Sequence, residues 1–174
     1  MNEIICPVIG TIRTPYKTTR GVPIRSAATR GVRAAVELKP EFADGLKDLE
    51  GFSHICLIFN FHQSTGYDLH VKPFLDDTPR GLFATRAPRR PAQIGLSVVR
   101  LTGVDGNILH IEDPDMVDGT PLLDIKPYIP DAVPRRKVRI GWLKGRTKRM
   151  KTFRSDRRFD KEADAVPGHN PDAG

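Results

Sequence analysis

The chain is divided into short apolar runs, each ended by glycine, proline or aspartate. The clearest run is residues 54–61, HICLIFNF, which is almost wholly apolar and rich in β-branched and aromatic side chains. A run of this length and composition is typical of a buried strand. Further strands are predicted at residues 7–14, 34–38, 69–74, 82–86, 94–104, 107–111, 122–129 and 137–143. Many short strands at close spacing favour a mainly β fold, either a β-barrel or a strongly curved sheet.

Turn-forming residues refine this reading. Asp105-Gly106 separates two β-prone runs and predicts a tight hairpin. Pro127 interrupts the run 122–129, which places that strand at an edge or puts the proline at a strand end. Residues 40–49 begin with proline, carry Glu41 in the first turn and have the start of a helix. Residues 18–33 are rich in glycine, arginine and alanine and are expected to form a loop.

Length and cysteine content narrow the class of protein. A chain of 174 residues favours one domain, with room for an appendage. Its two cysteines, Cys6 and Cys56, are too few for a disulfide framework or a zinc set. No apolar stretch is long enough to span a bilayer, and the N-terminus lacks the pattern of a signal peptide. We therefore expect a cytoplasmic protein without membrane association.

Charge is distributed very unevenly along the chain. Residues 135–158 hold 12 of the 28 Lys/Arg residues and one of the 21 acidic residues, a net charge of +11. The remainder carries 16 basic and 20 acidic residues, a net charge of −4. Such a segment suggests a polyanionic partner, of which nucleic acid is the commonest, although a solvated tail is the alternative.

These shifts in composition predict three parts of the chain. Residues 1–133 are expected to form the β domain, and residues 134–158 a basic C-terminal extension. Residues 159–174 are expected to be a disordered tail, because apolar residues become scarce and proline, glycine, aspartate and asparagine end the chain.

Residues 80–97, RGLFATRAPRRPAQIGLS, interleave arginines with prolines and glycines. Proline limits backbone freedom, so such a loop can hold guanidinium groups in fixed directions for a carboxylate or a phosphate. The alternative is a surface loop with incidental arginines. The glycine-rich signatures of doubly wound nucleotide-binding folds are absent from the sequence.

Clustered acids and one polar pair complete the candidate chemistry. The stretch 112–130 contains Glu112, Asp113, Asp115, Asp118 and Asp124. Such acids can bind a metal, attract a cation or form turns, but their spacing is not that of a calcium loop, and no metal is expected. The pair His62-Gln63 ends the apolar run 54–61, where a barrel can place ligand-binding groups or a structural histidine.

Three segments taken together resemble a known family: residues 49–54 (LEGFSH), 80–101 and 115–130 (DMVDGTPLLDIKPYIP). They are similar to the TsaA-like, or YaeB-like, proteins, over about residues 5–131. The resemblance implies a single-sheet β-barrel with few short helices. It further implies an S-adenosylmethionine-dependent methyltransferase that modifies N6 of threonylcarbamoyladenosine at position 37, in the anticodon loop of tRNA. It also implies a homodimer with the cofactor near the subunit interface.

The resemblance carries the family's cofactor contacts onto five short segments of this chain. Arg86 can pair with the carboxylate of the cofactor, while Glu112 or Asp115 can offset its positive charge. Leu96 can cover the adenine. The implied cofactor-binding residues are Pro23, Ile24, Arg25, His62, Gln63, Arg86, Leu96, Glu112, Asp113, Pro114 and Asp115.

The reaction also needs a proton acceptor, because the adenine N6 has a conjugated lone pair and is a poor nucleophile. Candidate catalytic residues are Asp118, Tyr128 and His62, with Lys126 as an electrostatic helper. Asp118 is preferred because it lies in the densest motif, residues 118–121 (DGTP). The alternative is that this motif only forms a turn.

Two other functions remain open at this point. A non-catalytic nucleic-acid-binding β-barrel could have kept the fold and lost the reaction, and the departures from the family at Arg25, Ala92 and Gln93 favour it. A methyltransferase could also act on a different RNA or on a small molecule. In the hypothesis of a tRNA-modifying methyltransferase, the basic residues 135–158 bind the RNA backbone.

Overall fold

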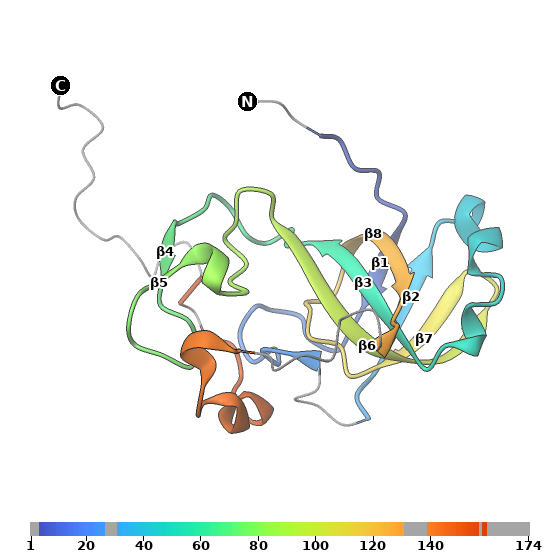
Figure 1. Ribbon diagram of the computed structural model, residues 1–174. Coiled ribbons are helices and arrows are strands. Elements are labelled where there is room, and N and C mark those ends of the chain that lie inside the picture. The colour runs from blue at the N-terminus through green and yellow to red at the C-terminus, as the bar shows by residue number, and fades with distance from the viewer. Residues whose placement is uncertain (1–3, 27–30, 131–138, 157, 160–174) are drawn as a thin grey trace.

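The structure is a computed structural model that describes residues 4–26, 31–130, 139–156 and 158–159. Its centre is a closed antiparallel barrel with the strand order β1-β2-β7-β6-β3-β8 (Figure 1). The barrel strands are β1 (Gly10–Arg13), β2 (Arg33–Leu38), β3 (His54–Asn60), β6 (Ile94–Asp105), β7 (Ile108–Glu112) and β8 (Thr120–Pro127). The prediction of a mainly β, single-sheet barrel is confirmed.

Alternation along the strands fills the barrel. In β3, Ile55, Leu57 and Phe59 are almost fully buried, while the residues between them are only partly buried. Successive side chains of a strand point to opposite faces, so one face of β3 enters the core and the other faces outward. The run 54–61 carries apolar residues on both faces, but only one of these faces lies inside the barrel.

Strand β6 pairs with different neighbours along its length. Its first half, from Ile94 to Arg100, pairs with β3, and its second half pairs with β7. Strand β7 ends at Glu112, opposite Arg100, so the chain that follows β7 runs beside the first half of β6. The predicted Asp105-Gly106 hairpin joins β6 to β7 and is confirmed, with Gly106 at the positive φ of 57° that a tight turn favours.

The predicted strand at residues 82–86 is wrong. The chain instead forms the short β4 (His70–Val71) and β5 (Arg80–Gly81), which pair with each other, and then the 3₁₀ helix η4 (Leu82–Ala84). The Thr85 hydroxyl closes this turn by donating to the Leu82 carbonyl at 2.7 Å. Leu82 is buried against Val71, so tertiary packing outweighs the local β propensity.

The predicted strand at residues 137–143 is also wrong where the structure describes it. Residues 137 and 138 lie outside the described residues. Gly141–Leu143 form the 3₁₀ helix η6, followed by η7 (Thr147–Lys151). Gly141 has a φ of 53°, which does not fit an extended strand.

Two weaker predictions are confirmed with adjustments. Pro127 is the last residue of β8, as expected for a strand end, but β8 lies between β1 and β3 and is not an edge strand. The helical start at residue 40 forms the 3₁₀ helix η2 (Pro40–Leu46), and η3 (Leu49–Gly51) follows it.

Within the described ranges, no helix has both the length and the apolar character needed to traverse a bilayer.

Residues 139–156 and 158–159 pack against one end of the barrel, and we call them the C-terminal strap. Figure 1 shows the strap beside β4 and β5, with η2 and η3 at the other side of the barrel. Phe159, the first residue of the expected disordered tail, packs against the small apolar cluster of Val71, Leu82 and Ala87. Residues 160–174 lie outside the described residues.

Candidate active site

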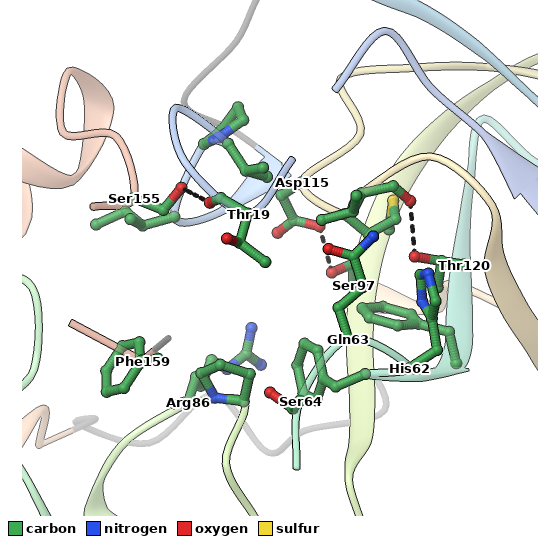
Figure 2. Close-up of a pocket in the computed structure, with 18 of the residues that line it drawn as sticks. Thr19, His62, Gln63, Ser64, Arg86, Ser97, Asp115, Thr120, Ser155 and Phe159 are labelled. Atoms are coloured by element: carbon green, nitrogen blue, oxygen red, sulfur yellow. Dashed lines mark hydrogen bonds between the residues drawn. The ribbon is translucent and has the colours of Figure 1, made fainter. Parts of the chain in front are cut away.

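A pocket opens at the end of the barrel where β3 ends and where β6 and β8 begin. It holds about 990 Å³ when the open space at its mouth is included. Its wall comes from the barrel, from connecting loops and from the C-terminal strap (Figure 2). Seven of the predicted cofactor residues line it: Pro23, Ile24, His62, Gln63, Arg86, Leu96 and Asp115.

Arg86 is the arginine of its loop that is left available to a ligand. Arg89 is ion-paired with Asp68 at 2.7 Å, and Arg90 donates to two backbone carbonyls of its own loop. Arg86 lines the pocket and makes no hydrogen bond or ion pair with any residue that the structure describes. A guanidinium in this position can bind a carboxylate or a phosphate.

Asp115 lies on the opposite side of the pocket from Arg86 (Figure 2). The Ser97 hydroxyl donates to its Oδ1 at 2.5 Å. Burial raises the pKa of Asp115 to about 6, although hydrogen bonds from Ser97 and from the Ser26 backbone, together with the Arg86 charge, oppose the shift. The carboxyl is therefore mostly ionised at neutral pH, and its partly buried charge favours a positively charged ligand group.

Aromatic side chains make much of the pocket wall apolar. Phe59 and Phe61, at the end of β3, pack edge to face with 5.3 Å between their ring centroids. Phe74 and Phe159 pack in the same way at 5.0 Å. Leu96 also lines the pocket, although 47% of its surface is exposed. Flat apolar surfaces of this kind suit a planar heterocycle.

His62 is the one predicted catalytic residue that lines the pocket. It follows β3 directly, and its backbone N–H donates to the Asn60 carbonyl at 2.9 Å in the turn that ends the strand. Figure 2 shows His62 beside Thr120, the first residue of β8. The end of a core strand thus brings an imidazole to the pocket.

The C-terminal strap contributes Ser155, Asp156 and Phe159 to the pocket wall. The sequence pattern assigned these residues to a basic extension and a disordered tail and predicted no site residue among them. A signal was present, because Trp142, Phe153 and Phe159 are bulky aromatic residues within an otherwise basic segment. Such side chains favour docking onto an apolar surface.

Three predicted cofactor residues at the end of β7 and directly after it do not line the pocket. Glu112 is ion-paired with Arg100 at 2.7 Å. Asp113 has a positive φ of 62°, and Pro114 is fully buried. These residues instead form the turn that places Asp115 beside β6.

Arg25 does not line the pocket either. Its Nη1 lies 3.9 Å from the sulfur of Met150, in helix η7 of the strap. Its neighbours Pro23 and Ile24 do line the pocket, so this loop contributes residues to the pocket wall and also contacts the strap.

Asp118, the preferred proton acceptor, also lies outside the pocket wall. Its Oδ1 accepts from the Thr14 backbone N–H at 2.9 Å, and its Oδ2 accepts from Lys17 Nζ at 2.8 Å. The Lys17 ammonium lowers the pKa of Asp118, which makes the carboxylate a weaker base. Gly119 follows with a φ of 76°. This geometry favours the turn interpretation, and a catalytic role for Asp118 stays a prediction.

Lys126 and Tyr128 lie at the far end of β8. Lys126 is ion-paired with Asp124 at 2.8 Å, and the Tyr128 backbone N–H donates to the His54 carbonyl at 3.1 Å. A strand rises about 3.3 Å per residue, so Lys126 is about 20 Å along β8 from Thr120, which lines the pocket. Within one chain, the structure does not bring these two side chains together with His62.

In the part of the chain that the structure describes, no group of three or more His, Cys, Asp or Glu side chains is placed to hold a metal ion. The acidic stretch 112–124 is instead divided among ion pairs, turns and the pocket carboxyl of Asp115.

Comparison with known proteins connects this pocket to a family. The profile of the tRNA-methyltransferase O (TrmO) N-terminal domain matches residues 11–132, which extend from the second residue of β1 to five residues past the end of β8. The chain belongs to the TrmO N-terminal domain family. The match therefore covers the whole barrel and the pocket residues between β1 and β8, but it ends before the C-terminal strap.

Relatives within the TrmO family are similar over most of this chain. A probable S-adenosyl-L-methionine-binding protein of Pyrococcus abyssi is 50% identical over 151 residues, covering 87% of this chain and 82% of that protein. The tRNA (adenine(37)-N6)-methyltransferase of Escherichia coli is 40% identical over 134 residues, covering 71% of this chain and 57% of that enzyme.

Solved TrmO structures show the same fold. The crystal structure of TrmO from Pseudomonas aeruginosa superimposes with a TM-score of 0.63 at 38% identity, covering 79% of this chain and 62% of that chain. This chain thus spans about three fifths of the length of the bacterial proteins that it matches.

Sequence similarity to one relative continues beyond the family domain. The similarity to the Pyrococcus protein covers 87% of 174 residues, whereas residues 1–132 make up a smaller share. That similarity must therefore extend past the family domain and into the C-terminal part of the chain.

Proposed function

We propose that this chain is an S-adenosylmethionine-dependent methyltransferase that modifies an adenine N6 in tRNA. The observation that carries the proposal is the pair of opposite charges across the pocket, Arg86 and Asp115, in a member of the TrmO N-terminal domain family. The names of two relatives support it: an S-adenosyl-L-methionine-binding protein of P. abyssi and the tRNA (adenine(37)-N6)-methyltransferase of E. coli.

The residues of the pocket fit three chemically different parts of S-adenosylmethionine. The available guanidinium of Arg86 suits the carboxylate of the amino-acid part. The Asp115 carboxylate suits a positive group, either the ammonium or the sulfonium. The rings of Phe59 and Phe159 suit the planar adenine. Few common ligands combine an anionic group, a cationic group and a flat heterocycle in one molecule.

The pocket residues would then serve the reaction in separate roles. When bound, the cofactor supplies an electrophilic methyl group on its positively charged sulfur. Arg86 and Asp115 hold the ligand in one orientation, because alignment with the acceptor nitrogen provides much of the rate in a direct displacement. The acceptor nitrogen loses a proton as its new bond to carbon forms. We propose that His62 takes that proton, because it lines the pocket.

The finer identity of the acceptor belongs to the same proposal. The acceptor would be the adenine at position 37, beside the anticodon, carrying the threonylcarbamoyl group that the family resemblance implies. The names of the E. coli and mouse relatives support position 37. A homodimer, a cytoplasmic location and the division at about residue 133 are further parts of this proposal.

Calorimetry of the full chain with S-adenosylmethionine tests the cofactor site. We expect the wild-type chain to bind and Arg86→Ala to lose most of the affinity, because one of two charged contacts is removed. Arg33→Ala is the matched control, since Arg33 is exposed on β2 and does not line the pocket. Wild-type affinity in Arg86→Ala would contradict the assignment of this residue.

The reaction is tested by incubating the chain with labelled cofactor and with tRNA that carries or lacks threonylcarbamoyladenosine. Mass analysis of the nucleosides should show methyl transfer only to the tRNA that carries the modification. Transfer to neither tRNA, with cofactor binding intact, would point to a different acceptor. Binding of RNA without binding of cofactor would favour the non-catalytic barrel.

A further inference from the structure

The C-terminal strap has two faces with different chemistry. Its inner face contacts the barrel and the pocket through Trp142, Met150, Phe153, Ser155 and Phe159. Its outer face carries lysine and arginine side chains. The strap lies beyond the matched family domain, so its role does not follow from the family profile.

One anchor of the inner face is a short backbone ladder with the loop after β1. The Gly21 N–H donates to the Ser155 carbonyl at 2.8 Å, and the Ser155 N–H donates to the Val22 carbonyl at 2.8 Å. Pro23 and Arg154 form an antiparallel bridge beside them. Val22 and Pro23 line the pocket themselves, so the strap is fixed to the pocket wall and not merely near it.

A second anchor surrounds Phe74, another residue of the pocket wall. Phe153 packs against its ring at 5.8 Å, and Phe159 packs edge to face at 5.0 Å. The Arg158 guanidinium lies 5.1 Å from the same ring, and its Nη1 donates to the Pro73 carbonyl at 2.7 Å. Three strap side chains therefore converge on one aromatic residue of the pocket.

A third anchor lies further from the pocket. The Trp142 indole N–H donates to the Ala84 carbonyl at 2.8 Å, just before Arg86 in the sequence. Arg80 lies 5.8 Å from the Trp142 ring and is ion-paired with Asp76, which Arg146 of the strap also approaches at 3.5 Å. The strap thus contacts the same loop that presents Arg86.

The outer face has the character of a nucleic-acid surface. Lys144, Lys148, Arg149 and Lys151 are exposed, and none of them is ion-paired with an acidic residue in the described ranges. Three of these side chains belong to the last turn of η7, within a few residues of Phe153. Clustered cations of this kind bind phosphates by releasing counterions.

We infer that the strap is shared by two ligands, so that the RNA on its outer face and the cofactor behind its inner face bind with positive coupling. The inference rests on the proposed function and specifies how the two substrates of that site assist each other. Residues of the two faces lie next to one another along the same short segment, so a ligand that orders one face also orders the other. Either ligand that stabilises the docked strap therefore reduces the ordering that the other ligand must impose.

Thermodynamic linkage makes this coupling measurable from both sides. If RNA raises the affinity for the cofactor by some factor, the cofactor must raise the affinity for RNA by the same factor. Coupling between sites commonly corresponds to about fivefold or more, and we expect a factor of about fivefold here. An RNA that pulled the strap away from the pocket would give the opposite sign.

The test is calorimetry of the full chain with S-adenosylhomocysteine, with and without a saturating tRNA transcript. For the wild-type chain we expect tighter binding of S-adenosylhomocysteine when tRNA is present. Removing the outer charges in the double variant Lys148→Ser/Lys151→Ser should leave the affinity without tRNA unchanged. It should abolish most of the enhancement and reduce the salt slope of tRNA binding by about 1.5.

The matched control for charge is Lys39→Ser/Lys47→Ser, which removes two exposed lysines at the other end of the barrel. This variant should keep the full enhancement. If it loses the enhancement as well, general electrostatic attraction explains the effect and the inference is overturned.

The inner face is tested by Phe159→Ala, which should weaken S-adenosylhomocysteine binding about fivefold or more without tRNA, because an aromatic wall of the pocket is lost. Phe83→Ala is the matched control, since Phe83 is 76% exposed and outside the pocket wall. Ser155→Pro offers a second route, because proline removes the N–H that the strap donates to Val22.

The possible failures are distinguishable. A wild-type chain that binds no S-adenosylhomocysteine contradicts the proposed function itself. Binding by the wild-type chain that stays equally tight in Phe159→Ala and in Ser155→Pro overturns the inner-face role alone. Equal cofactor affinity with and without tRNA, or weaker affinity with tRNA, overturns the positive coupling.

Discussion

The two ends of the barrel are closed in different ways. At the far end, η2 and η3 follow β2 directly in the sequence, and Leu46 and Leu49 pack from them onto the core. At the pocket end, the wall comes from segments near residues 22, 62, 86, 115 and 155, which are far apart in the sequence. Residues that follow one another in the sequence cover one end, while segments far apart in the sequence converge at the other end and enclose the pocket.

The difference shows where chemistry can develop on a small barrel. The far end also has a hollow, which is lined by apolar residues such as Phe42 and Phe52 and by the charged residues Lys47, Asp48 and Asp124. The pocket end combines a guanidinium, a buried carboxyl and an imidazole with aromatic walls. The two ends therefore differ in the chemical groups that distant segments bring together, and the groups at the pocket end are the ones that suit a small charged ligand.

The largest effect is expected from the core that both ends share. Leu57 is fully buried in the middle of β3, between β6 and β8. Leu57→Ala should lower the free energy of unfolding by about 2–5 kcal/mol, because a cavity remains where the side chain was. Chemical denaturation should show one transition for probes at either end; two separated transitions would break the view of a single cooperative barrel.

A smaller effect should separate the two ends of β6. A Cβ at Gly95 would lie 2.3 Å from the Phe59 ring, whereas a Cβ at Gly103 would meet only the His110 ring, at 3.8 Å. Gly95→Ala should therefore cost about 1–3 kcal/mol of stability and weaken cofactor binding, because Phe59 lines the pocket. Gly103→Ala is the control at the far end and should change neither quantity appreciably. Equal effects of the two substitutions would contradict this comparison.

The third prediction concerns pH and the two neighbouring acids of the pocket end. The pKa of Asp115 is raised to about 6 in the folded state, above its unfolded value of about 3.8. The folded state therefore binds the proton more tightly, and stability falls as pH rises between these two values. Asp115→Asn should be more stable than the wild type at pH 8 by about 1–2 kcal/mol, with little difference at pH 3.

Asp118 should behave in the opposite way. Its pKa is lowered by Lys17, so the stability that it contributes is present above the unfolded pKa and is lost as pH falls through the folded value. Thermal unfolding of Asp115→Asn and Asp118→Asn from pH 3 to pH 8 measures both trends. Parallel pH profiles for the two variants would contradict the assignment of one acid to the pocket and the other to a surface turn.

The smallest effects are expected at the far end of β8. Lys126→Ala removes an exposed ion pair with Asp124, and such pairs contribute little to stability because water and salt screen them. Tyr128→Phe removes only a hydroxyl. Both variants should keep the affinity of the wild type for S-adenosylmethionine in calorimetry. A large loss in either one would show that the far end contributes to the site, for example through a second copy of the chain.

The sequence predicted best what depends on local chemistry. The run 54–61 became β3, and Asp105-Gly106 became a hairpin, because period-two apolar patterns and turn residues act over a few positions. His62 was identified because it follows the apolar run 54–61, and Arg86 because the family resemblance implies a cofactor-binding arginine at that position. The prediction of a strand at residues 82–86 was wrong because Leu82 is buried by contacts with residues elsewhere in the chain, which a local sequence pattern does not show.

The spatial separation of residues within one motif, and contacts between segments far apart in the sequence, were harder to predict. Asp118, Lys126 and Tyr128 all belong to the stretch 115–130, yet the strand β8 separates Asp118 from the other two residues. The docking of Ser155 onto residues 21–22 joins segments more than 130 positions apart, and no local periodicity encodes such a contact. The aromatic residues in the basic segment were the one visible sign of it.

Trp142 is the only tryptophan in the chain, and it sits on the strap with its indole held by the Ala84 carbonyl and faced by Arg80. Indole emission depends strongly on hydration and on nearby charge. The intrinsic fluorescence of the unlabelled protein is therefore a built-in optical reporter of whether the strap is seated, readable in real time while either substrate is added.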